Sequence, residues 1–175
     1  MPTRSFGGDD IAAMEDRYRV FFVNALSGFK AAHLVGTRSS EGQDNLAVFT
    51  SIVHIGANPP LLGLVSRPNT VPRDTLENIA ATGEYTINHV NSDMLSAAHQ
   101  TSARYPAEVS EFEATGLTPH HSERLAAPYV AESRLTIGLE HRQTIDIELN
   151  GTHLVIGEIV EVIVDSEAIA EDGWV

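Results

Sequence analysis

The sequence contains no cysteine among its 175 residues. Without thiols the chain can form neither a disulfide nor a cysteine-ligated zinc or iron–sulfur site, and it has no thiol nucleophile. Any redox chemistry therefore needs a cofactor to carry the electrons. The chain also lacks a run of about 18 apolar residues that could cross a membrane, and residues 1–10 lack the apolar stretch of a signal peptide. We expect a cytoplasmic protein with no membrane partner.

Positive charge is scarce as well. Eleven lysines and arginines stand against 24 aspartates and glutamates, which gives a formal net charge of -13. A nucleic acid would be repelled by such a chain, so we expect no nucleic-acid partner. Only Lys30 is a lysine, and arginine is therefore the residue available to bind a phosphate group, which its planar fork suits.

The length is that of one domain, and we see no internal repeat or linker. We assign residues 1–13 to an N-terminal arm and residues 14–175 to the domain. Apolar periodicity and turn residues indicate an antiparallel, mainly β protein with helical decorations, and the dipeptide Asn150-Gly151 predicts a two-residue hairpin turn. The predicted strands are 31–37, 45–55, 61–65, 85–90, 135–139, 144–149 and 152–164, and the predicted helices are 14–29, 75–82, 93–103 and 109–114.

Residues 66–75 join a predicted buried strand to the predicted helix 75–82. The first turn of a helix offers unpaired N–H groups and a partial positive charge, which together favour an anion. Asp74 and Glu77 have the spacing of a capping box, so the loop is equally typical of a capped helix with solvated arginines, and Asp74 would repel an anion beside it. Two arginines and three hydroxyls flank this helix end: Arg67, Arg73, Ser66, Thr70 and Thr75.

The strand that includes residues 45–52 is a second candidate element. A flat heteroaromatic ring with an imide edge needs backbone N–H and C=O groups within reach and small side chains beside them. Thr50 and Ser51 provide such a strand, and Ile52 has an apolar side chain that suits packing on a ring. Threonine and serine are also common on strands that bind nothing.

In their order and spacing, a set of short motifs resembles the flavin reductase-like, FMN-binding split-barrel family. The resemblance covers residues 17–165. The motifs are Asn45-Leu46-Ala47, Thr50-Ser51, Asn58-Pro59-Pro60-Leu61-Leu62-Gly63, Ser66-Arg67-Pro68, Asp74-Thr75, Asn78-Ile79, Tyr105-Pro106, Glu111-Phe112, Gly116-Leu117-Thr118, Ala131-Glu132-Ser133 and Gly157-Glu158-Ile159.

The resemblance implies a Greek-key split β-barrel that forms a homodimer and binds FMN, rather than FAD, near the subunit interface. It also implies reduction of the flavin by NADH or NADPH, often for a partner monooxygenase. By position, Asn45, Thr50, Ser51 and Ile52 would line the ring and ribityl chain. Four residues would hold the phosphate, with two more as neighbours: Ser66, Arg67, Thr75 and Asn78, then Thr70 and Arg73. Hydride transfer to a flavin requires no side-chain acid or base, so we name no catalytic residue.

Other chemistries lack a motif in this sequence. Its eight histidines form no helical pair with a carboxylate base, so we expect no metal site, and only His99 lies on a helix that the family places near the flavin. Neither a Gly-x-Ser-x-Gly elbow nor a Gly-x-Gly-x-x-Gly or Walker loop is present. NAD(P)H would therefore bind only transiently, against the flavin.

Three functions remain open at the level of sequence. The first is an NAD(P)H:flavin oxidoreductase, the second a non-enzymatic FMN-binding protein or electron carrier of the same fold, and the third a degenerate domain that serves in assembly. Four aromatic residues in the first part of the chain favour a homodimer, because one small core does not need them all, although all four could be core: Phe21, Phe22, Phe49 and Tyr105.

Overall fold

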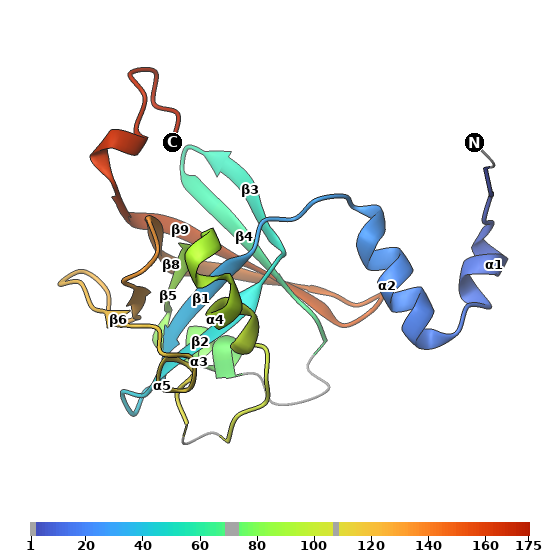
Figure 1. Cartoon of the computed structure of the whole chain (residues 1–175), viewed down its shortest axis with the longest axis horizontal. Helices are drawn as coiled ribbons and strands as arrows, with labels where there is room; N and C mark the ends of the chain where they lie inside the picture. The colour runs from blue at the N-terminus through green and yellow to red at the C-terminus, as the bar shows by residue number, and fades with distance from the viewer. Residues whose placement is uncertain (1–2, 69–73, 107–108) are drawn as a thin grey trace. The chain divides into compact units, whose positions relative to one another are not determined.

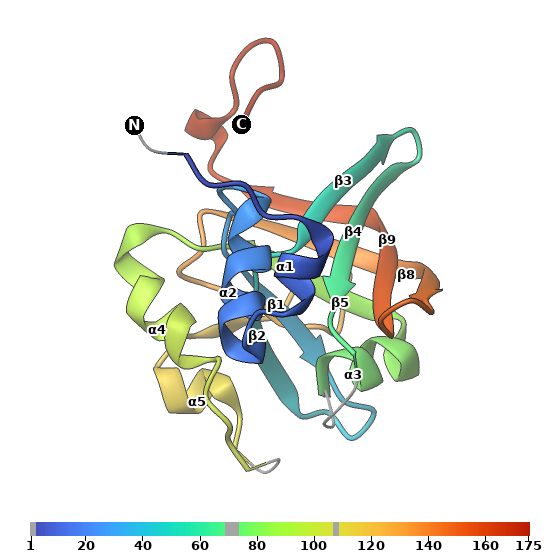
Figure 2. The same ribbon diagram turned by 90° about the vertical axis from the view of Figure 1, so that its right-hand side faces the viewer.

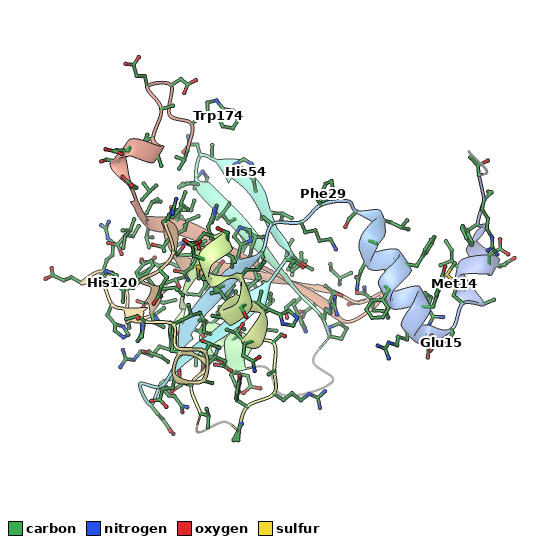
Figure 3. All side chains as sticks on the ribbon, in the orientation of Figure 1. Met14, Glu15, Phe29, His54, His120 and Trp174 are labelled. Carbon is green, nitrogen blue, oxygen red and sulfur yellow. The ribbon has the colours of Figure 1, made fainter. Side chains whose placement is uncertain are left out.

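The computed structural model describes residues 3–68, 74–106 and 109–175. The chain divides into two compact units, Met1–Lys30 and Ala31–Val175. The first unit contains α1 (Gly8–Ala12), within the expected N-terminal arm, and α2 (Asp16–Leu26), within the predicted helix 14–29. The side chain of Glu15 accepts a hydrogen bond from the Tyr18 N–H (2.9 Å) and so begins α2 as its N-cap (Figure 3).

The second unit is built on one antiparallel sheet of seven strands (Figure 1). Its spatial order is β2-β1-β5-β8-β9-β4-β3. The strands are β1 (His33–Arg38), β2 (Asp44–Phe49), β3 (Ile52–Ala57), β4 (Pro60–Ser66), β5 (Glu84–His89), β8 (Leu135–Ile147) and β9 (Thr152–Val164), and a separate ribbon pairs β6 (Pro119–His120) with β7 (Tyr129–Val130). The helices are α3 (Asp74–Thr82), α4 (Leu95–Gln100) and α5 (Glu111–Thr115), with single 3-10 turns η1 (Ser92–Met94) and η2 (Ser166–Ala168).

The two edge strands of this sheet, β2 and β3, are consecutive in the sequence and are joined by Thr50 and Ser51. The Val65 N–H donates to the Ser51 carbonyl (2.9 Å), which extends the β3–β4 ladder up to this junction. The two edges of the sheet therefore meet through the chain itself, at Thr50 and Ser51. The prediction of a mainly β split barrel is confirmed. The prediction of one strand over residues 45–55 is wrong, because β2 pairs with β1 and β3 pairs with β4. The alternation of side chains continues through the junction and does not reveal the change of partner.

Buried side chains fill the barrel and a second space beside it. Inside the barrel, Tyr85 lies against β9 at Gly157, where a Cβ atom would come within 2.3 Å of the Tyr85 hydroxyl oxygen, so only glycine fits. The barrel cluster consists of Val35, Leu64, Ile79, Tyr85, Ile87, Leu139 and Val155. The second cluster packs β1 and β2 against α4 and α5 and consists of Leu34, Leu46, Met94, Ala98, Phe112, Leu117 and Val130.

The strands β8 and β9 form a long hairpin of 13 residues each. The predicted break between residues 139 and 144 is wrong: β8 is continuous, with register shifts at Gly138/Leu139 and at His141/Gln143. Such bulges bend a strand without ending it. The hairpin itself is confirmed, but its loop has four residues, 148–151, with Gly151 at φ 70°. Within the described residues, no helix is long and apolar enough to cross a membrane.

Two histidines face each other at one end of the barrel. His33 on β1 pairs with His89 on β5, and the two rings meet edge to face at 4.8 Å. The His33 Nδ1 atom is buried, without a hydrogen-bond partner among the described residues. Burial and the neighbouring His89 lower the pKa of His33 to about 4, and burial also lowers the pKa of His89. Both rings are therefore neutral in the native protein at pH 7.

This pair predicts a loss of stability in acid. The unfolded chain takes up protons on both histidines near pH 6.5, whereas folded His33 resists protonation until about pH 4. The stabilisation is complete above pH 6.5 and declines as the pH falls through that value. Between pH 7.5 and pH 5, we expect urea unfolding of the wild type to lose about 1–2 kcal/mol more than that of His33→Leu, after allowance for solvent screening. His54→Leu, at an exposed position on β3, is the control, and an equal pH response of all three proteins would contradict the assignment.

Candidate functional site

A cavity of about 880 Å³ opens along the free edge of β2. Residues 47–50 form its floor. One wall comes from the end of β4 (Val65 to Arg67) and the start of α3 (Asp74 to Leu76), and the other from Thr101 to Tyr105, after α4. Figure 2 shows α3 and α4 on opposite sides of β2. The volume is typical of a small-molecule or cofactor site.

Six of the ten residues that we predicted to bind a cofactor line this cavity. Ile52 does not, because it packs against the barrel cluster, and Asn78 lines an adjoining cavity of about 130 Å³. Thr70 and Arg73 lie outside the described residues. The six lining residues are Asn45, Thr50, Ser51, Ser66, Arg67 and Thr75.

The fully buried hydroxyl of Thr37 ties the elements of the cavity together. Its oxygen accepts hydrogen bonds from the side-chain amides of Asn45 (3.0 Å) and Asn78 (3.1 Å). The Asn45 amide also lies 3.3 Å from the Thr75 hydroxyl oxygen and donates to it. One threonine on β1 thus connects β2 to the first turns of α3. Asn78 does not line this cavity, but its hydrogen bond to Thr37 holds the first turns of α3 in position beside it.

The outer edge of β2 offers backbone groups to the cavity. The Leu46 N–H donates to a carboxylate oxygen of Glu111 (3.1 Å), and the Ser110 hydroxyl donates to the Asp44 carbonyl (2.9 Å). In an antiparallel pair, alternate residues direct both backbone groups to the same side, so the N–H and C=O of Val48 also point away from β1. No described residue bonds to either group. Val48 therefore presents a donor and an acceptor to the planar edge of a ligand.

The wall formed by β4 and α3 carries several groups that suit an anion and one carboxylate, that of Asp74, that opposes it. Ser66, at the end of β4, and Thr75, in the first turn of the nine-residue helix α3, are almost fully buried, at 1% and 5% exposed, and both line the cavity. The guanidinium of Arg67 has no ion pair or hydrogen bond with a described residue. A helix N-terminus, two hydroxyls and a free guanidinium are the groups that bind a phosphate monoester.

Sequence analysis missed the opposite wall, Thr101 to Tyr105, and it missed Glu111. The available signal is the pair of motifs Tyr105-Pro106 and Glu111-Phe112, which belong to the family resemblance but are not among the predicted cofactor-binding residues. The ring of His99 is exposed and does not line the cavity, but its carbonyl accepts from the Ser102 hydroxyl (2.7 Å). Within the described ranges, no three histidine or acidic side chains gather as metal ligands.

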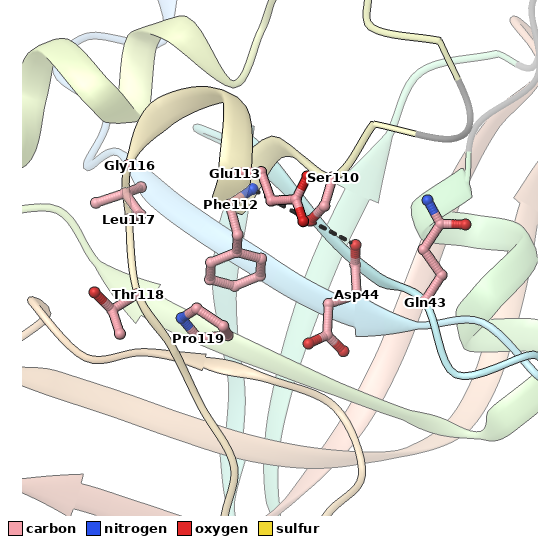
Figure 4. A pocket seen from close by; sticks show the side chains of 9 residues that line it. All are labelled: Gln43, Asp44, Ser110, Phe112, Glu113, Gly116, Leu117, Thr118 and Pro119. Carbon is pink, nitrogen blue, oxygen red and sulfur yellow. Dashed lines mark hydrogen bonds between the residues drawn. The ribbon is translucent and has the colours of Figure 1, made fainter.

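A second cavity, of about 540 Å³, lies between α5 and the start of β2 (Figure 4). Two carboxylates, those of Asp44 and Glu113, line it, and its described lining contains no arginine or lysine. A phosphate would be repelled there. The cavity along β2 is also lined by two carboxylates, those of Asp74 and Glu111, but it contains Arg67 and Arg104 as well. It is therefore the better candidate for a phosphorylated cofactor.

Comparison with known proteins identifies the family of this chain. Residues 29–172 match the family model described as a flavin reductase like domain. The chain belongs to this family. A candidate flavin reductase with a split barrel domain from Shewanella frigidimarina is 50% identical, with a TM-score of 0.94, and the match covers 99% of this chain and 86% of that one.

Two further solved structures extend the comparison of this flavin reductase-like protein. Nitrilotriacetate monooxygenase component B from Bacillus cereus shares the fold at 23% identity, with a TM-score of 0.86 over 100% of this chain and 87% of that one. Flavoredoxin of Desulfovibrio vulgaris is 26% identical, with a TM-score of 0.71 over 83% of this chain and 75% of that one.

The hydrogen bonds of Thr37 lead to a testable expectation. Thr37→Val keeps the side-chain volume but leaves the buried amide of Asn78 without its acceptor, and the Asn45 amide keeps only its bond to Thr75. A buried donor without a partner destabilises by about 1–3 kcal/mol, so we expect a loss of that size in chemical denaturation. Thr144→Val is the control, since Thr144 is exposed on β8. Equal unfolding midpoints for the two variants would refute this role of Thr37.

Proposed function

We propose that the protein binds FMN in the cavity along β2 and catalyses its reduction by NADH or NADPH. The proposal rests on one cavity of suitable volume, in which groups that suit an anion and an unpaired strand edge lie together. It is supported by the membership of the chain in the flavin reductase-like family. When bound, FMN would supply the two-electron acceptor that a chain without cysteine lacks.

Each part of the cavity fits one part of FMN. Ser66, Arg67 and Thr75 would hold the phosphate, where charge-assisted hydrogen bonds are strongest. Asn45 is fixed by Thr37 and would contact the ribityl chain. The free N–H and C=O of Val48 would bond to the imide edge of the ring, with Thr50 and Ser51 beside it. Thr70 and Arg73 remain predicted neighbours of the phosphate.

The donor would bind transiently, because the sequence has no dinucleotide-binding motif. The protein's part in the reaction is to hold the two rings in contact and to exclude water, and no side chain needs to move a proton. We further propose that the reduced flavin serves a partner monooxygenase, since a protein of the same fold is named as a component of one. The alternative is a non-enzymatic FMN-binding protein or electron carrier. Oxidation of NADH or NADPH that depends on added FMN distinguishes the two.

Removal of the Arg67 guanidinium tests the phosphate site. One charge-assisted hydrogen bond is worth about 1.5–3 kcal/mol, so Arg67→Ala should weaken FMN binding by roughly ten- to a hundredfold in a fluorescence titration. Riboflavin, which lacks the phosphate, should bind both proteins equally. Arg134→Ala removes an exposed arginine outside the cavity and should change neither affinity. Equal losses for FMN and riboflavin would rule out this phosphate site.

We also propose that two copies associate and that the partner completes the flavin pocket. The outer face of the β3–β4 hairpin and of β8–β9 supports this. Val53, Ile55 and Ile145 are 44%, 41% and 41% exposed there, and Leu154 lies opposite Ile145. A Cβ atom at Gly63 would touch Val53, Ile55 and Leu154, so these side chains form one apolar patch. A twofold pair is the commonest way to cover such a patch.

Light scattering tests this assembly. We expect a mass of twice 18.9 kDa at micromolar concentration, and we expect Ile145→Lys to give a monomer, because it places a charge in the apolar patch. If the partner completes the pocket, FMN affinity should fall with dimer dissociation. A wild-type mass near 19 kDa would end the dimer proposal, and unchanged FMN affinity in a monomeric variant would end the shared pocket.

A further inference from the structure

The described arginines divide clearly by their partners. Six of the nine have one: Arg19, Arg38 and Arg142 pair with carboxylates, Arg124 donates to a carbonyl, and Arg4 and Arg17 lie over phenylalanine rings. Within the described ranges, only three have no ion pair, hydrogen bond or ring contact: Arg67, Arg104 and Arg134.

Two of these three uncommitted arginines, Arg67 and Arg104, line the same cavity. The chain has a net charge of -13, so free positive charge at one place is unusual in it. The two stand on different walls, Arg67 beyond the end of β4 and Arg104 beyond the end of α4. FMN carries one phosphate, which the proposed function assigns to Ser66, Arg67 and Thr75. Arg104, on the other wall, is then available to an anionic group of another molecule.

The backbone around Arg104 is held in place. The Ser102 hydroxyl donates to the His99 carbonyl (2.7 Å), and the Ala103 N–H donates to the Gln100 carbonyl (3.0 Å). On the other side of Arg104, the Tyr105 hydroxyl accepts from the Gln100 side-chain amide (2.8 Å). A cation presented from a fixed turn loses less conformational entropy when it binds an anion.

Carboxylates around the cavity restrict where that anion can lie. Asp74 stands at the α3 end, and Glu111 stands along β2, where one of its oxygens is bonded to the Leu46 N–H. An anion would be repelled by both, and Arg104 is the cation available to it on the α4 side. The α4 side is thus the favourable approach for a second phosphorylated molecule.

We propose that Arg104 binds the pyrophosphate of the nicotinamide dinucleotide and so favours phosphate-bearing hydride donors over donors without phosphate. This inference rests on the proposed function. The pyrophosphate of the dinucleotide matches the planar fork of a guanidinium. Arg67 binds the resident cofactor and Arg104 binds the transient donor, so the two arginines have separate effects on the kinetics.

The experiment compares two kinds of hydride donor, the phosphate-bearing nucleotides and a donor without phosphate. NADH and NADPH carry phosphates, whereas N-benzyl-1,4-dihydronicotinamide carries the same reacting ring and none. We expect Arg104→Gln to lower kcat/KM for NADH and NADPH by roughly ten- to a hundredfold, mainly through KM, with kcat/KM for the benzyl compound unchanged. The affinity for FMN should also stay unchanged. Arg104→Lys should recover part of the loss, because it restores the charge without the fork.

Arg67→Gln is the matched control within the same cavity. It should weaken FMN binding. At saturating FMN, its preference for the nucleotide donors over the benzyl compound should be that of the wild type. Three results would each overturn the role of Arg104. They are an equal fall in kcat/KM for the nucleotide donors and the benzyl compound in Arg104→Gln, no fall for any of them, and weakened FMN binding like that of Arg67→Gln. A wild-type protein that binds FMN but oxidises neither donor would overturn the proposed reductase function, and this inference with it.

Discussion

The closure of the barrel at Thr50 and Ser51 is the constraint on which the rest of this structure depends. Because β2 and β3 follow each other in the chain yet pair at opposite ends of one sheet, the barrel can close only where they join. One edge of β2 pairs with β1, and no described strand covers its other edge. Backbone groups in a protein interior need partners, so this edge has to be met by side chains, by water or by a ligand.

The chain meets that need in two different ways along the edge. Near its start, Ser110 and Glu111 supply side-chain partners to Asp44 and Leu46. Farther along, at Val48, no described residue does so, and Val48 lines the cavity. The same strand is therefore sealed at one end and available for binding at the other. A cofactor with a donor–acceptor edge would complete the hydrogen bonding of the strand as well as bind to it.

Buried polar groups hold this arrangement in place. The Thr37 hydroxyl is fully buried and accepts from two amides, so β1, β2 and α3 cannot shift against one another without leaving a donor unpaired. The cavity also contains two arginines, Arg67 and Arg104, that have no partner among the described residues, whereas most other described arginines are paired. Their positive charge is therefore available to bind phosphate groups.

The sequence by itself determined the class of fold and most of the elements, because apolar periodicity, glycine stops and cap residues act over a few neighbours. That residues 66–75 bind an anion stays a prediction. The sequence also identified Ser66, Arg67 and Thr75, since a strand end followed by a helix start is a local pattern. Tertiary structure decided the rest. Strand pairing shows that β2 and β3 are separate strands, and it places Ile52 against the barrel cluster. The fold also brings the Asn78 amide within hydrogen-bonding distance of Thr37. It also brings Arg104 to the cavity of Arg67, because contacts between residues distant in sequence depend on how the sheet closes.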